Sequence, residues 1–146
     1  MRQLDTFRPH VLGLFRIVVA LLFFCHGLST MFGVIATPPG GESPSLGEWP
    51  GWWAAAIQLV GGGLVLVGYG TRGAAMICSG SMAFAYFTEH QADGLLPLQN
   101  NGEPAAMFCW AFFLIMFLGP GNWALSTLVE RYRNQQEPVR EPAARG

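Results

Sequence analysis

Residues 11–32 read VLGLFRIVVALLFFCHGLSTMF and contain one charged side chain, Arg16. A helix over this stretch is about 33 Å long at 1.5 Å per residue, against a bilayer hydrocarbon core of about 30 Å. The run is too long for the apolar region of a secretory signal, which has roughly 7 to 15 residues, and Arg16 interrupts it. The stretch therefore predicts a transmembrane helix that stays in the mature protein.

The remainder of the chain has the composition of a membrane protein. Of its 146 residues, 51% are hydrophobic and only 12% are charged, whereas soluble domains have about 25% charged residues. Three further apolar stretches cover residues 52–69, 73–88 and 104–118. We therefore expect an all-α fold, namely a transmembrane four-helix bundle with both termini in the cytoplasm. Because the last two stretches reach only about 24 and 22 Å, a very hydrophobic soluble bundle is the alternative.

The charges orient the predicted bundle, because cytoplasmic segments of membrane proteins are enriched in Arg and Lys. The order expected is a cytoplasmic segment at residues 1–10, a membrane domain at residues 11–123, and a cytoplasmic tail at residues 124–146 that is first helical and then disordered. A net charge of -1 offers no basic stripe for nucleic acid. The two longer connections carry Glu42, Glu48, Glu89, Asp93 and Glu103, and the opposite segments carry Arg2, Arg8, Arg72, Arg131, Arg133, Arg140 and Arg145.

Polar side chains gather at the outer end of the predicted bundle. His26 and Gln58 each lie about six residues inside their helices, near 9 Å deep, while His90 closes the third stretch and Glu103 opens the fourth. Such a cluster could relay protons, hydrogen-bond a quinone-like head group or hold a metal ion. The absence of a compact HxxxH pair argues against a metal site. We take these four residues as candidate ligand-binding residues and assign no catalytic residue.

Arg16 is a fifth candidate, near the cytoplasmic end of the first helix, about 8 Å deep. Its side chain either extends to the lipid phosphates or faces inward and holds an anionic or carbonyl-bearing ligand. Cys25 and Cys109 lie level near the outer surface and are either small apolar core residues or a pair for thiol chemistry. A row of small residues, Ala75, Ser79 and Ala83, predicts a face of the third helix that packs against another helix.

In order and spacing, these features resemble the DoxX family of small bacterial membrane proteins over most of residues 12–127. The resemblance implies four transmembrane helices in the bacterial cytoplasmic membrane and an association with quinone-linked oxidation of sulfur compounds. Gln58 stands where many members have Glu, and Thr30 stands where a Lys often follows the His-Gly pair. The resemblance is carried by Arg16, His26 with Gly27, Phe32 with Gly33, residues 68–72 (GYGTR), His90, residues 96–103 (LPLQNNGE) and residues 119–125 (GPGNWAL).

Together, these features predict a subunit or anchor of a membrane redox system that contacts a quinone in the outer half of the bundle and is not catalytic alone. The expected partners are the lipid membrane and another membrane or redox protein, or further copies of this chain, but no nucleic acid. Two alternatives remain open. One is a noncatalytic scaffold that binds another membrane protein, and the other is a carrier of small solutes or protons.

Overall fold

The computed structural model describes residues 2–38 and 41–136, and within these ranges the chain is helical and has no strands. The predicted all-α class is thus confirmed, and each of the four apolar stretches contains a helix. A π-helical turn, η1 (Tyr86–His90), and a 3-10 turn, η2 (Gln91–Asp93), continue the third helix. The α-helices are α1 (Arg2–Phe32), α2 (Gly51–Val67), α3 (Thr71–Ala85), α4 (Glu103–Leu118) and α5 (Leu125–Gln136).

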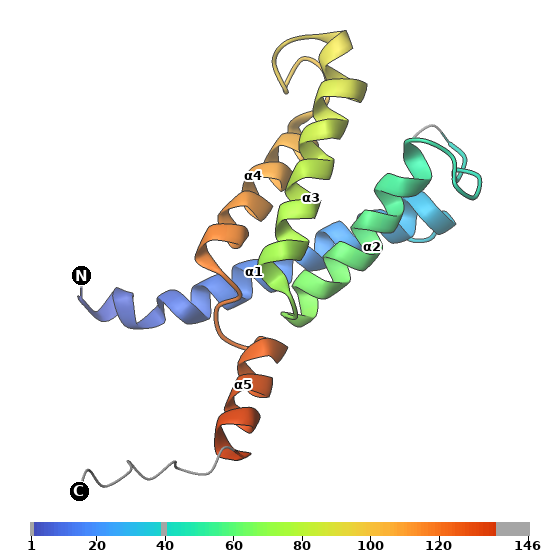
Figure 1. The fold of residues 1–146 in the computed structure, drawn as a ribbon. Coiled ribbons are helices and arrows are strands. Elements are labelled where there is room, and N and C mark those ends of the chain that lie inside the picture. Colours follow the sequence, from blue (N-terminus) through green and yellow to red (C-terminus); the bar gives the residue numbers. More distant parts are fainter. Residues whose placement is uncertain (1, 39–40, 137–146) are drawn as a thin grey trace, which may run out of the picture.

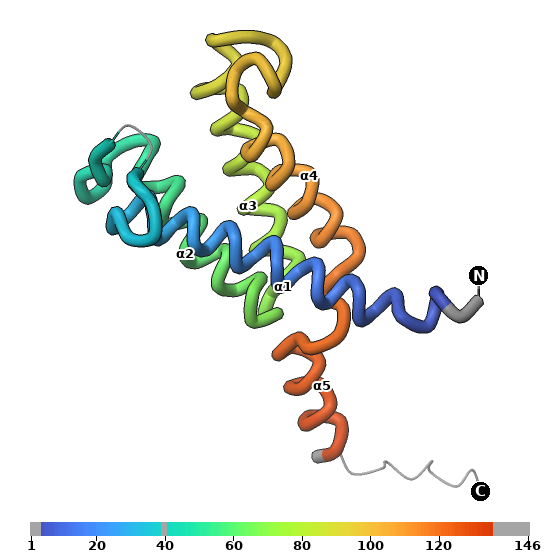
Figure 2. Tube along the Cα trace, turned by 180° about the vertical axis from the view of Figure 1, so that it is seen from behind, coloured from blue at the N-terminus to red at the C-terminus, as the bar shows by residue number. Residues whose placement is uncertain are grey.

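The first four helices form two antiparallel pairs, α1 with α2 and α3 with α4 (Figure 1). The pairs contact each other mainly through α2 and α3, and Phe23 of α1 also contacts Phe112 of α4. From the tight turn between α2 and α3 the pairs diverge. The α1–α2 loop and the α3–α4 loop therefore lie at separate ends of a V (Figure 2). Helix α5 projects away from the bundle on the side of that turn.

Two glycines allow the tight turn between α2 and α3. Gly68 (φ 77°) and Gly70 (φ 57°) are both in the left-handed region, which glycine occupies without the steric penalty of a Cβ. Gly68 also lies against Ala124, because a Cβ added to Gly68 would come within 2.6 Å of the Ala124 Cβ. The turn is thus packed under the segment that leads into α5.

The interior of the bundle is small and the outside is apolar. Phe23, Val65, Cys78, Phe112 and Ile115 are buried together where the helices meet. An apolar exterior around all four helices is typical of a protein surrounded by lipid rather than water. The large hydrophobic side chains exposed on it include Val18, Leu22, Val60, Met76, Trp110, Phe113 and Phe117.

Helix length supports fewer membrane-spanning helices than the four that the sequence predicted. Within the described residues, Leu4–Phe32 is long and apolar enough to cross a membrane, with a mean hydropathy of 2.2. The apolar helices α2 and α4 have 17 and 16 residues, which is shorter than the roughly 20 residues of a standard span. The crossing of the membrane by all four helices therefore stays a prediction.

The row of small residues on α3 faces α4, as the sequence predicted for a helix contact. The Ser79 hydroxyl donates a hydrogen bond to the Cys109 carbonyl of α4 at 2.9 Å, and Ala75 is fully buried. The predicted helix at the start of the tail is also present as α5. The predicted disorder at the end of the tail falls on residues 137–146, which lie outside the described residues.

Candidate functional site

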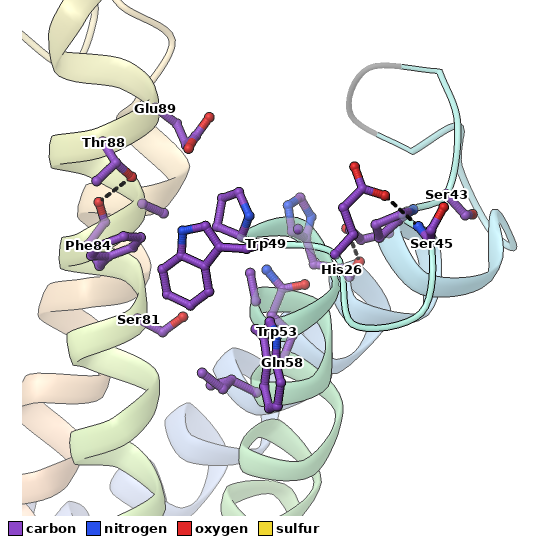
Figure 3. Close-up of a pocket in the computed structure, with 18 of the residues that line it drawn as sticks. His26, Ser43, Ser45, Trp49, Trp53, Gln58, Ser81, Phe84, Thr88 and Glu89 are labelled. Atoms are coloured by element: carbon purple, nitrogen blue, oxygen red, sulfur yellow. Dashed lines mark hydrogen bonds between the residues drawn. The ribbon is translucent and has the colours of Figure 1, made fainter.

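A cavity of about 910 Å³ lies between the two helix pairs, on the side of their loops (Figure 3). Five parts of the chain contribute to its wall: the end of α1, the loop at residues 42–50, the first half of α2, the outer half of α3 and the turn η1. The divergence of the pairs explains its position, because side chains from α2 and α3 no longer meet there. We call this cavity the outer pocket.

Gln58 is the most unusual polar residue in the wall of the outer pocket. Only 5% of its surface is exposed, and its carbonyl oxygen Oε1 is shielded from solvent without a hydrogen-bond partner. Gly27 lets α1 approach α2 at this point, since a Cβ added there would lie 2.9 Å from the Gln58 Cβ. A buried amide group without a partner is costly, so Gln58 is suited to a hydrogen bond with a bound molecule.

His26 lies on the same wall, one residue before Gly27, and its side chain is exposed. The structure thus brings His26 and Gln58 together in one pocket, as their equal depth in neighbouring helices predicted. Figure 3 shows both side chains on the α1–α2 side of the pocket.

Aromatic rings connect the two sides of the outer pocket. Trp49, from the α1–α2 loop, contacts Phe84 of α3 with ring centroids 5.6 Å apart in an edge-to-face arrangement. Trp53 and Ser81 lie below this contact (Figure 3). The adjacency of Trp49 to the pocket could not be predicted from the sequence, because the direction of the loop was unknown.

Three carboxylates at the mouth complete the outer pocket: Glu42, Glu48 and Glu89. Glu48 accepts a hydrogen bond from the backbone N–H of Ser45 at 2.7 Å, which holds the loop in a turn over the mouth. These residues were expected at the outer end but were not chosen as site residues. The sequence signal that could have identified them is that both outer connections contain acidic residues and no arginine.

The structure does not bring His90 and Glu103 to the outer pocket. His90 Nδ1 lies 3.1 Å from the Asn100 carbonyl, within the α3–α4 loop, and Glu103 is exposed at the first residue of α4. Asn100 also holds that loop by donating to the Gly94 carbonyl at 2.8 Å. Helix α4 approaches α1 as far as Phe108, whose ring centroid lies 6.4 Å from that of His26, but His90 and Glu103 lie beyond this contact, at the end where the helix pairs diverge.

Arg16 lies at the opposite end of the bundle and is fully buried. Its Nη1 donates to the carbonyls of Val65 and Leu66, both at 2.6 Å, in the last turn of α2. Its Nε donates to the Pro120 carbonyl at 2.8 Å and its Nη2 to the Trp123 carbonyl at 3.0 Å. Arg16 thus faces inward, as one interpretation required, but the carbonyl groups that it binds belong to this chain. It does not extend to lipid phosphates.

Arg72 has a similar role on the other helix pair. Its Nη1 donates to the carbonyls of Met116 and Phe117 at 3.1 and 3.0 Å, in the last turn of α4. A cation is favourable at the carboxyl end of a helix, where unpaired carbonyls carry partial negative charge. At the basic end of the bundle, Arg16 and Arg72 therefore stabilise the ends of helices. The outer pocket lies at the opposite, acidic end.

The three cysteines are free thiols. Cys78 is buried in the core, and Cys25 and Cys109 are each partly buried. In the described ranges, no cluster of three or more His, Cys, Asp or Glu side chains has the arrangement of a metal site.

The fold and the site define a class. An all-helical bundle with an apolar exterior and a polar pocket at its acidic end is typical of a membrane protein, and the pocket is the candidate ligand site. Residues 11–91 match the DoxX family. An uncharacterized protein of Haemophilus influenzae (strain ATCC 51907 / DSM 11121 / KW20 / Rd) is 36% identical over 128 residues, which cover 86% of this chain and 95% of that protein. No solved structure matches the chain. The chain belongs to the DoxX family, as the sequence features predicted, and this family is membrane-associated.

Proposed function

We propose that this DoxX family membrane protein crosses the bacterial cytoplasmic membrane four times, through α1 to α4, with both termini in the cytoplasm. The distribution of charge supports this topology, because Arg72 and the arginines of α5 lie at one end and the acidic loops at the other. The apolar exterior of the bundle supports contact with lipid on all sides. In this orientation the outer pocket opens toward the extracytoplasmic surface.

Labelling of single cysteines tests this topology. In a variant whose three native cysteines are replaced by alanine, Ser45→Cys is expected to react with a membrane-impermeant maleimide added to intact cells. Asn134→Cys, in α5, is expected to react only after the membrane is permeabilised. Reaction of Asn134→Cys in intact cells, or protection of Ser45→Cys there, would reverse the orientation and move the outer pocket to the cytoplasmic side.

For the function, we propose a subunit or anchor of a quinone-linked membrane redox system, which works with another membrane or redox protein. The ligand is a lipid-soluble molecule whose head group lies between His26 and Gln58. The nearly buried amide of Gln58 in the wall of a large cavity carries this proposal, because its Nε2–H can donate a hydrogen bond to a quinone carbonyl. A quinone or its reduced form has a head group of the right kind, because its ring oxygens exchange hydrogen bonds and its tail is apolar.

Binding measurements on purified protein in lipid nanodiscs test this function. We expect a short-chain quinone to bind, and His26→Ala and Gln58→Leu each to weaken its binding about three- to tenfold, the value of one hydrogen bond or slightly more. His90→Ala is the matched control, because His90 lies outside the outer pocket, and it should leave affinity unchanged. Equal losses for all three variants, or no binding by the unmodified protein, would contradict the proposed site.

A further inference from the structure

The outer pocket is longer than a head group requires. Along α3 and η1 its lining runs from Glu89 at the mouth to Ile77, which is about 18 Å at 1.5 Å per residue. Just beyond Ile77 the helices α2 and α3 approach closely, since a Cβ added to Gly61 would lie 2.5 Å from the Cys78 Sγ. The pocket therefore extends from the point where the helix pairs separate to the loops, and a ring bound near His26 fills only its outer part.

The lining of the outer pocket changes from polar to apolar along this length. The outer part contains Glu48, Thr88 and Glu89, whereas Ile77 and Gly80 form the inner part on α3. A molecule with a polar head and an apolar tail matches this order, because its head lies near the membrane surface and its tail lies deeper. The inner part of the pocket is thus suited to the start of a hydrocarbon tail.

Two sides of the outer pocket are closed or covered. Toward α4, aromatic rings fill the space between the helix pairs. Phe23 contacts Phe112 with ring centroids 4.6 Å apart, and Phe108 lies 6.4 Å from the His26 ring. Among the described residues, those that line the pocket include none from α4. The loop at residues 42–50 lies over the outer end. A long tail therefore needs another way out.

The side between α2 and α3 is open at the level of the lipid chains. Trp53 and Ile77 line the pocket, yet 50% and 56% of their surfaces are exposed. Gly80 lies about 14 Å along α3 from its first residue, close to the middle of a hydrocarbon core. A Cβ added to Gly80 would meet no atom within 4 Å. Figure 3 shows Trp53 and Ser81 on the two walls of this opening.

We propose that the ligand enters the outer pocket sideways from the bilayer, between α2 and α3, and that its apolar tail passes Gly80. This inference rests on the proposed function, and it specifies a ligand that never leaves the membrane. Lipid is as apolar as the tail, so the tail gains little from complete burial in protein. The opening lets the head group bind while the tail stays in contact with lipid. The small size of Gly80 then sets the width of the passage.

The experiment compares tetramethylbenzoquinone with the analogue in which a decyl chain replaces one methyl group. Decanamide, whose head group carries no electrons, is the third ligand. Each ligand is distributed between nanodiscs with and without the protein, so that its solubility in lipid cancels. Gly80→Phe should weaken binding of both decyl ligands about tenfold, because a ring in the passage overlaps with the tail. Binding of tetramethylbenzoquinone should not change, since it has no tail to place.

Gly73→Phe is the matched control. Gly73 lies two turns from Gly80 on the same face of α3, and a Cβ there also meets nothing within 4 Å. It does not line the outer pocket, so binding of all three ligands should stay unchanged. Gly80→Ala introduces a smaller obstacle, and we expect it to weaken binding of the decyl ligands less than Gly80→Phe does.

The results separate this inference from the proposed function. If Gly80→Phe weakens both quinones equally, or neither, the sideways passage is overturned and the quinone-linked function stays in place. Binding of decanamide that depends on Gly80, without binding of either quinone, supports the passage and overturns the redox function. Failure of all three ligands to bind overturns both.

Discussion

The Arg16→Leu variant is expected to lose about 3–5 kcal/mol of stability, because several carbonyl oxygens lose a charged donor and each buried acceptor left without a donor costs about 1–3 kcal/mol. The substitution removes four hydrogen bonds that join α1 to the end of α2 and to the loop after α4. Leucine does relieve the cost of placing a charge in lipid, which is roughly 2.5–3.5 kcal/mol at the bilayer centre. That cost is smaller toward a helix end, where Arg16 lies, so the loss of the hydrogen bonds dominates.

The fraction of monodisperse protein that survives heating in mild detergent measures this loss. Arg8→Leu is the matched control on the same helix. Arg8 is exposed and forms an ion pair with Asp5, and such surface pairs contribute about 0–1 kcal/mol. Similar survival of the two variants would contradict the role of Arg16 as the buried connection between α1, α2 and the loop.

The Gly121→Ala variant is expected to lose about 2–5 kcal/mol, because two penalties combine. Gly121 has φ 65°, a conformation that costs other residues about 1–2 kcal/mol. An added Cβ would also lie 2.5 Å from the Gly13 nitrogen and 2.9 Å from the Pro9 carbonyl oxygen. These are backbone atoms of α1 that no side-chain rotation can move, and overpacking of this kind costs about 1–3 kcal/mol.

Gly47→Ala separates the two penalties in the same heating assay. Gly47 has φ 78°, and a Cβ there would meet nothing within 4 Å, so this control has only the conformational penalty. We expect Gly121→Ala to be the less stable variant. The Asn122 N–H donates a hydrogen bond to the Pro9 carbonyl at 2.9 Å, which indicates that the segment after α4 packs closely against α1. Equal losses of stability in the two variants would contradict this close packing.

The helices were predictable because long apolar runs have few other structures in a membrane protein. The ends of α2 and α4 agree with the predicted stretches within two residues. Helix α1 begins earlier than the apolar run, at Arg2, since hydropathy reports contact with lipid and not helix length. The divergence of the pairs was not predictable. It depends on which small residues of different helices contact each other, whereas the sequence gives only their positions along each helix.

The candidate site was predictable in part for a related reason. His26 and Gln58 belong to consecutive antiparallel helices, so equal depth is enough to bring them close. His90 and Glu103 belong to the other helix pair, and they could join His26 and Gln58 only if the two pairs stayed close at this end. The V-shaped arrangement separates the pairs there. The partners of Arg16 are backbone carbonyls, which every residue has, so no sequence pattern marks them. The acidic loop at residues 42–50 contains turn-forming residues. These predict that the chain reverses there, but not the side toward which the loop folds.

The central claim is that a lipid-soluble ligand binds between the two helix pairs in the outer pocket. Photolabelling tests it most directly, with a decyl benzoquinone that carries a light-activated azide, in nanodiscs, followed by mass spectrometry. The account predicts that label attaches to Trp53, Ile57 or Ser81 and that an excess of the same benzoquinone without the azide prevents it. Label that attaches to outward-facing residues of α4, such as Trp110 and Phe113, and resists competition would contradict the account.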